Sequence, residues 1–81
     1  MKIPRNVSAD FIIKQLLKLG YEITRQKGSH IRLKKKYFDG EHHITIPNHN
    51  PIKIGTLNNI LNDISLQSKV KKEELIEILF S

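Results

Sequence analysis

The spacing of apolar residues changes at Gly20, and this change most constrains the fold. Before Gly20 the apolar residues recur at helical spacing, behind Ser8, a residue type favoured at helix N-termini. They are Phe11, Ile12, Leu16 and Leu19. After Gly20, apolar and polar residues alternate, as in half-buried strands. A helix over residues 8–19 followed by strands predicts an α+β domain.

Two alternating segments flank Lys27-Gly28-Ser29 and predict a hairpin. A two-residue turn at Lys27-Gly28 would place Ile23 opposite Arg32 and divide the apolar residues between both faces. A three-residue loop instead places Ile23 opposite Leu33, Thr24 opposite Arg32 and Gln26 opposite His30. We therefore predict a three-residue loop.

The rest of the chain predicts a third strand and two more helices. Residues 42–46 alternate as a strand, and the apolar stripe from Ile54 to Ile64 is typical of a helix. A short helix is expected around residues 71–79. This order predicts a single domain over residues 1–81, with helices on one face of a three-stranded antiparallel sheet. The open face is expected to hold Thr24, Gln26, His30, Arg32, Lys34, His43 and Thr45.

The charge of the chain favours a polyanionic partner. Fourteen Lys and Arg residues against eight Asp and Glu give a formal net charge of +6. The segment from Ile23 to Lys36 holds six cations and no acid. Five of these cations are candidate RNA contacts: Arg25, Lys27, Arg32, Lys34 and Lys35. A positive net charge also keeps small domains soluble, so the position of these cations decides between RNA binding and solubility alone.

Other features of the composition restrict location and cofactors. The sequence has no cysteine, which fits a reducing cytoplasm, and no long apolar run that could cross a bilayer. His42 and His43 are consecutive on a strand, so their rings point to opposite faces and cannot share an ion. We expect a cytoplasmic protein with no membrane partner, no metal and no other cofactor.

His30 is the candidate catalytic residue. RNA cleavage without a metal needs a base for the 2′-hydroxyl proton, an acid for the departing oxygen, and cations for the phosphate. Histidine suits either proton-transfer role, because its usual pKa of about 6.5 lies near neutrality. Gly28 removes a side chain where a nucleotide backbone could approach, and Ser29 offers a hydroxyl and an N–H. A solvated histidine on a basic strand is the structural alternative.

Ser29 and His49 are two further candidates for the reaction. Ser29 is a poor nucleophile for His30 to activate, because consecutive strand residues point apart and no carboxylate orients the imidazole. His49 follows the third strand and serves either as a second proton-transfer group or RNA contact, or as an ordinary loop residue.

An ordered set of motifs resembles a known family. Gly28-Ser29-His30 follows a segment ending in Leu19-Gly20-Tyr21 and precedes Ile46-Pro47-Asn48-His49, Gly55-Thr56-Leu57 and Ile60-Leu61. Between Ser8 and Ile64 the chain resembles the HicA toxins, whereas residues 66–81 look less typical of them. The resemblance implies a double-stranded-RNA-binding-domain-like fold, metal-independent cleavage of mRNA, and neutralisation by a HicB-type antitoxin. It implies that His30 is the catalytic histidine and that Gly28 and Ser29 position it. His49 matches a position that recurs in the family but is less certain.

Three functions fit these features. The first is a toxin endoribonuclease acting on mRNA, for which we favour single-stranded RNA because a flexible strand more easily aligns the reacting atoms. The second is a non-catalytic RNA-binding module that uses the same basic sheet face without needing His30. The third is a protein-interaction module whose basic face docks an acidic partner, and an antitoxin would use that same surface.

Overall fold

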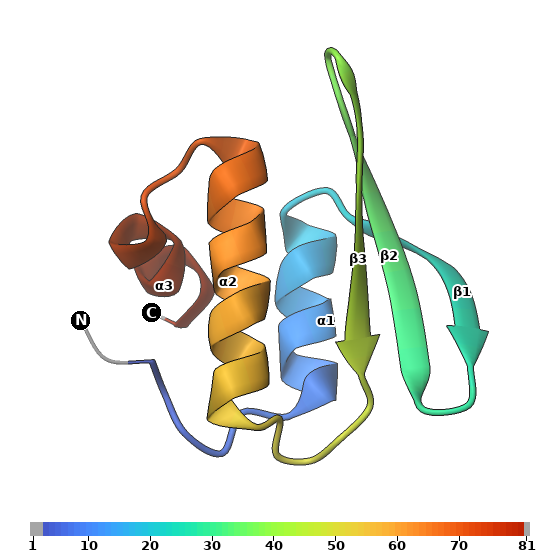
Figure 1. The fold of residues 1–81 in the computed structure, drawn as a ribbon, viewed down its shortest axis with the longest axis vertical. Coiled ribbons are helices and arrows are strands. Elements are labelled where there is room, and N and C mark those ends of the chain that lie inside the picture. The colour runs from blue at the N-terminus through green and yellow to red at the C-terminus, as the bar shows by residue number, and fades with distance from the viewer. Residues whose placement is uncertain (1–2, 81) are drawn as a thin grey trace.

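The chain forms one helix, a three-stranded antiparallel sheet and two further helices (Figure 1). The computed structural model describes residues 3–80. The elements are α1 (Ala9–Lys18), β1 (Glu22–Lys27), β2 (His30–Tyr37), β3 (Gly40–Pro47), α2 (Ile54–Ser68) and α3 (Lys72–Phe80). This order confirms the predicted α+β layout.

Helix α1 begins and ends where the sequence predicts. The Ser8 hydroxyl accepts a hydrogen bond from the Phe11 N–H at 3.1 Å, which satisfies one of the free donors of the first turn. At the other end the Tyr21 N–H donates to the Leu16 carbonyl at 3.0 Å. Gly20 makes this reversal with φ +104°, a conformation that glycine adopts with little strain.

The core lies between the helices and one face of the sheet. The sheet order is β1-β2-β3, and Figure 1 shows the helices on one side of it, with β1 farthest from them. The most deeply buried side chains come from the first two helices and two strands: Ile12, Leu16, Leu33, Ile46, Leu57, Leu61 and Ile64. Residues of β1 are exposed along the whole strand. Ile31, Leu33, Ile44 and Ile46 are buried on the inner face, as the alternation of apolar and polar residues along these strands predicts.

The turn between β1 and β2 differs from the prediction. Lys27 pairs with His30, so Gly28-Ser29 forms a two-residue turn and not a three-residue loop. Gly28 has φ +58°, as the first position of a type II′ turn requires. Ile23 still pairs with Leu33, because a β-bulge at Thr24 takes up the extra residue. The prediction assumed an unbroken ladder and therefore assigned that residue to the loop.

The C-terminal segment is part of the core. Helix α3 packs against α2 and buries Leu75, Ile76 and Leu79, and the rings of Phe80 and Phe11 stack with centroids 5.7 Å apart. Residues 72–80 therefore add a third helix beyond the sheet-covering pair, close to the predicted 71–79.

Candidate RNA-binding and catalytic face

The pairing of the three strands arranges the open face in rows. Residues directly opposite one another in an antiparallel sheet point to the same side, and alternate residues along a strand share that side. Row 1 is Lys27, His30 and Pro47; row 2 is Arg25, Arg32 and Thr45; row 3 is Glu22, Lys34 and His43. Successive rows lie two residues of β2 apart, or about 6.6 Å. His30 therefore stands at one end of a three-row surface.

The bulge at Thr24 changes which side chains this face presents. Thr24 is the extra residue of β1, and its hydroxyl donates to the Arg32 carbonyl at 3.3 Å. Beyond the bulge, Arg25 stands opposite Arg32, while Gln26 stands opposite the inward-facing Ile31. The prediction that Gln26 faces His30 is wrong, and Lys27 takes that place. The bulge thus brings two of the predicted RNA-contacting cations next to His30 and Arg32.

Two motifs that are distant in sequence meet beside His30. The Ser29 carbonyl accepts a hydrogen bond from the Asn48 N–H at 2.6 Å, and His30 pairs with Pro47. Nothing lies within 4 Å of the place where a Cβ on Gly28 would stand, so the turn is open to an approaching molecule. Both Ser29 and His30 are exposed. The structure therefore joins the Gly28-Ser29-His30 corner to the Pro47-Asn48-His49 segment.

His49 lies in a loop that hydrogen bonds hold on both sides. Its own N–H donates to the Pro47 carbonyl at 2.9 Å, and on its other side the Asn50 side chain accepts from the Ala9 N–H at 3.1 Å. The His49 side chain is exposed. The loop is thus fixed next to the corner that carries His30.

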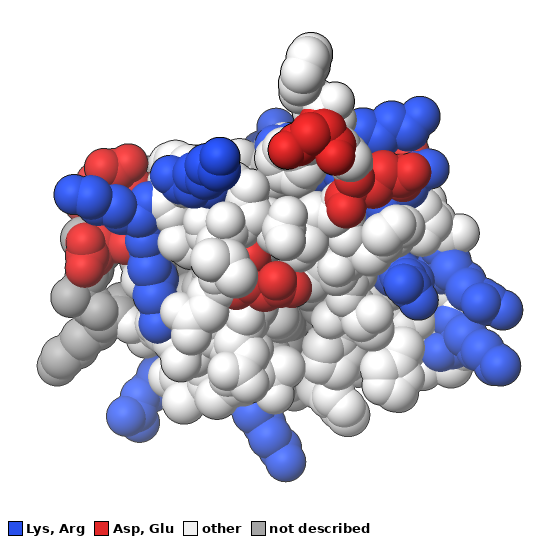
Figure 2. Space-filling view, turned by 45° about the horizontal axis from the view of Figure 1, so that its top comes forward, with Lys and Arg blue, Asp and Glu red and all other residues white. Residues whose placement is uncertain are grey.

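Rows 1 and 2 concentrate positive charge. Arg25 is directly opposite Arg32, and like charges in this position destabilise a sheet. Within residues 3–80, no carboxylate forms an ion pair with Arg25, Lys27 or Arg32. Figure 2 shows Lys and Arg side chains on both sides of the molecule, and those at the lower right, on the β1 side, have no acidic side chain among them in that view. Such an arrangement is typical of a surface that holds a polyanion.

Row 3 has a different charge balance. The Lys34 ammonium lies 3.8 Å from a carboxylate oxygen of Glu22 and 3.8 Å from one of Glu41. Glu41 also lies 3.7 Å from Nε2 of His43. The predicted RNA contact Lys34 is therefore held between two carboxylates, unlike the cations of rows 1 and 2.

The family of the chain follows from a comparison with family models. The model described as the HicA toxin of bacterial toxin-antitoxin systems matches residues 10–66, which is more than half of the chain. The chain belongs to the HicA toxin family. HicA toxins are the toxins of toxin–antitoxin pairs and are generally ribonucleases, so the family implies an antitoxin partner and an RNA substrate. No curated protein and no solved structure matches the chain.

The segment matched to the HicA toxins contains every residue of the three rows, together with His49. Lys35 lies in the same segment but on the other face of the sheet. Its ammonium stands 5.1 Å from the centroid of the Tyr37 ring and 5.9 Å from that of Tyr21. The structure therefore brings four of the five predicted RNA-contacting cations onto the His30 face and places Lys35 apart from them.

Beneath the sheet of this HicA toxin, a polar network links β3 to α2. The hydroxyl of Tyr21 lies 2.6 Å from Nδ1 of the buried His42, whose Nε2 lies 3.2 Å from the Asp63 carboxylate without the alignment of a hydrogen bond. Burial, with smaller contributions from Tyr37 and Asp63, raises the pKa of the Tyr21 hydroxyl well above its usual range. The hydroxyl therefore stays protonated, and it donates to Nδ1 in the tautomer whose proton is on Nε2, beside the Asp63 carboxylate. Sequence analysis missed this network, although the inward strand position of His42 was a signal for it.

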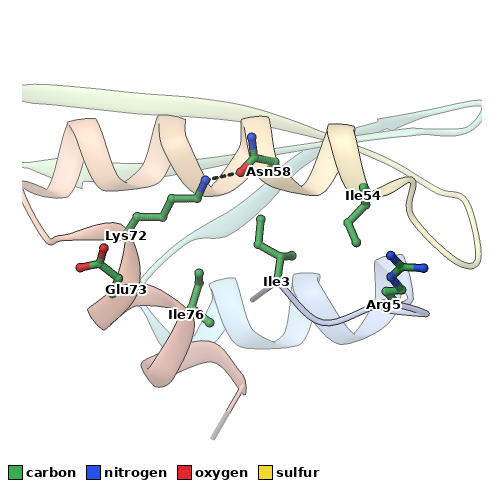
Figure 3. A pocket seen from close by; sticks show the side chains of 7 residues that line it. All are labelled: Ile3, Arg5, Ile54, Asn58, Lys72, Glu73 and Ile76. Atoms are coloured by element: carbon green, nitrogen blue, oxygen red, sulfur yellow. Dashed lines mark hydrogen bonds between the residues drawn. The ribbon is translucent and has the colours of Figure 1, made fainter. Parts of the chain in front are cut away.

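The largest cavity given by the described residues lies away from the His30 face. A cavity of about 800 Å³ opens between the N-terminal segment, α2 and α3. Figure 3 shows its lining, in which Lys72 hydrogen-bonds to Asn58 above three isoleucines. Its residues on α3 and the N-terminal segment lie outside the segment matched to the HicA toxins. Among residues 3–80, no three His, Cys, Asp or Glu side chains stand close enough to hold a metal ion, and no helix is long and apolar enough to cross a membrane.

Proposed function

We propose that this HicA toxin is an endoribonuclease that cleaves messenger RNA in the cytoplasm, as a single domain, without a metal ion. His30 transfers a proton, and a HicB-type antitoxin neutralises the activity. The observation that carries the proposal is the position of His30 in row 1, beside Lys27 and one row from Arg25 and Arg32. These cations have no carboxylate partner among the described residues and are free to bind phosphates.

Cleavage of RNA by this route needs proton-transfer groups and cations, and the open face presents both. A base takes the proton of a 2′-hydroxyl, the 2′-oxygen bonds to the adjacent phosphorus, and the bond from phosphorus to the 5′-oxygen breaks. The departing oxygen takes up a proton, which leaves a 2′,3′-cyclic phosphate and a free 5′-hydroxyl. Lys27 and Arg32 stabilise the charge that develops on the phosphate oxygens. His30 serves as the base or the acid, and His49, in the loop fixed beside Ser29, is the candidate for the other role.

The substrate proposed is single-stranded RNA. Rows 1 and 2 form an exposed strip along β2 on which a flexible strand can align its 2′-oxygen, phosphorus and departing oxygen. The antitoxin would act by covering this strip with acidic side chains. The competing function is a non-catalytic RNA-binding module, which the same cations would support.

The test is cleavage of a short RNA by the purified chain in excess EDTA. We expect cleavage, products that end in a 2′,3′-cyclic phosphate, and no cleavage where the nucleotide before the bond carries a 2′-deoxyribose. Binding of the RNA without cleavage would favour the non-catalytic module. Cleavage that EDTA abolishes would exclude the metal-free mechanism.

A further inference from the structure

We propose that Glu41 reads a nucleobase with an exposed amino group, cytosine over uracil, and so gives the toxin its base preference. This inference rests on the proposed function, because it assumes that RNA lies on the open face. The observation behind it is the change in charge along β2. Rows 1 and 2 present cations without carboxylate partners among the described residues, whereas row 3 and the adjacent Glu41 present paired charges of both signs.

The rows define a path for the strand. Rows 1 and 2 lie about 6.6 Å apart along β2 and can each hold one phosphate of an extended strand. A strand that continues in the same direction next meets Lys34, whose charge is offset by Glu22 and Glu41, each 3.8 Å away. Lys36 follows on the same face, directly opposite Glu41. Lys34 and Lys36 are thus offset by two carboxylates, so this end of the face attracts a further phosphate less than rows 1 and 2 do. The nucleotide that reaches row 3 therefore presents its base to the protein more favourably than its backbone.

Hydrogen bonding is the means by which row 3 can distinguish bases. The three rows contain no Phe, Tyr or Trp, and their aromatic rings are the imidazoles of His30 and His43. Stacking on a ring tolerates any base, so it does not by itself distinguish cytosine from uracil. A carboxylate accepts hydrogen bonds and donates none when ionised, so it matches the amino group of cytosine. Uracil has a carbonyl oxygen in that place, which a carboxylate repels.

Glu41 fits this role better than Glu22. Glu41 lies close to both Lys34 and His43, at 3.8 and 3.7 Å, so two neighbours restrict where its carboxylate stands. Glu22 contacts Lys34 alone, and its side chain is 65% exposed against 44% for Glu41. Both glutamates are exposed enough that their ion pairs contribute little to stability. Replacing either by glutamine should leave the fold intact.

The experiment compares Glu41→Gln with Glu22→Gln as a matched control, since each removes one negative charge beside Lys34. The probes are 2′-O-methyl hexamers of cytidine and uridine, which bind without being cleaved, and dissociation constants are measured by fluorescence anisotropy. We expect the wild type to bind the cytidine hexamer about tenfold more tightly than the uridine hexamer. Glu41→Gln should reduce this ratio to within twofold, and Glu22→Gln should preserve it. Both variants should bind the uridine hexamer more tightly than the wild type, because Lys34 becomes available to phosphates.

Three outcomes overturn the inference: equal binding of the two hexamers by the wild type, a ratio that survives in Glu41→Gln, or a ratio lost equally in Glu22→Gln. Cleavage of unmodified RNA by the same wild-type preparation is scored separately. A preparation that discriminates through Glu41 but cuts no RNA refutes the ribonuclease proposal and leaves the base-reading role standing. A preparation that cuts RNA but binds both hexamers equally refutes the base-reading role and leaves the ribonuclease proposal standing.

Discussion

Replacing Tyr21 by phenylalanine tests the buried network beneath the sheet. Tyr21 is 3% exposed and His42 is 5% exposed, so neither group can exchange the lost hydrogen bond for one to bulk water. The substitution removes the hydroxyl that lies 2.6 Å from His42 Nδ1 and leaves this nitrogen buried without that partner. A buried polar atom left in this way costs about 1–3 kcal/mol. For a chain of this size the corresponding loss in Tm is at least about 4 °C.

The matched control is Tyr37→Phe. The Tyr37 hydroxyl is also buried and lies close enough to Tyr21 to contribute to its raised pKa, but no group among the described residues is aligned to share a hydrogen bond with it. Tyr37→Phe therefore alters the same buried surroundings without removing the Tyr21–His42 hydrogen bond. Removal of the Tyr37 hydroxyl should cause no loss of stability, because a buried hydroxyl without a partner is itself unfavourable. Urea denaturation of the three proteins at neutral pH gives the free energies of unfolding. Equal losses in the two variants would refute the reasoning from the Tyr21–His42 hydrogen bond.

Three further predictions concern the sheet. Arg25→Gln should lower the slope of log binding constant against log salt by about 0.7, as expected for one lost phosphate contact on a single strand. It should not lower the free energy of unfolding, because Arg25 stands opposite Arg32; a clear loss in urea denaturation would contradict this. Lys35→Gln should leave the salt slope unchanged, since its ammonium lies over tyrosine rings on the other face, and a changed slope would place it on the RNA path. Gly28→Ala should cost about 1 kcal/mol through its positive φ of 58° and should also slow cleavage, because the new Cβ would stand in the open space through which a nucleotide backbone approaches; wild-type cleavage by the folded variant would show that the corner does not need this space.

Much of the fold could be predicted from local patterns. Ser8 and Gly20 mark the ends of α1, and the alternation around Ile31 and Ile44 determines which strand faces are buried, because these features depend on neighbours in sequence. The bulge at Thr24 could not be predicted in this way. It depends on how β1 pairs with β2 over the whole hairpin, and a two-residue turn with a bulge gives the same Ile23–Leu33 pair as a three-residue loop without one.

The candidate site was predicted as a set of residues rather than as an arrangement. The exposed position of His30 follows from the alternation of β2, and the structure agrees. The hydrogen bond between Ser29 and Asn48, the placement of Arg25 opposite Arg32, and the pairing of Lys34 with two glutamates depend on contacts across strands and loops. Lys35 shows the same limit, since a count of cations between residues 23 and 36 does not state which face each one occupies.

The rate of RNA cleavage by His30→Ala tests the central claim most directly. A general acid or base contributes about 10²- to 10⁴-fold to a reaction, so the single-turnover rate constant should fall by at least 100-fold. The dissociation constant for a non-cleavable RNA should stay within about threefold, because the cations of rows 1 and 2 remain. A variant that binds RNA normally and cleaves it within tenfold of the wild-type rate would contradict the assignment of His30 as the proton-transfer group.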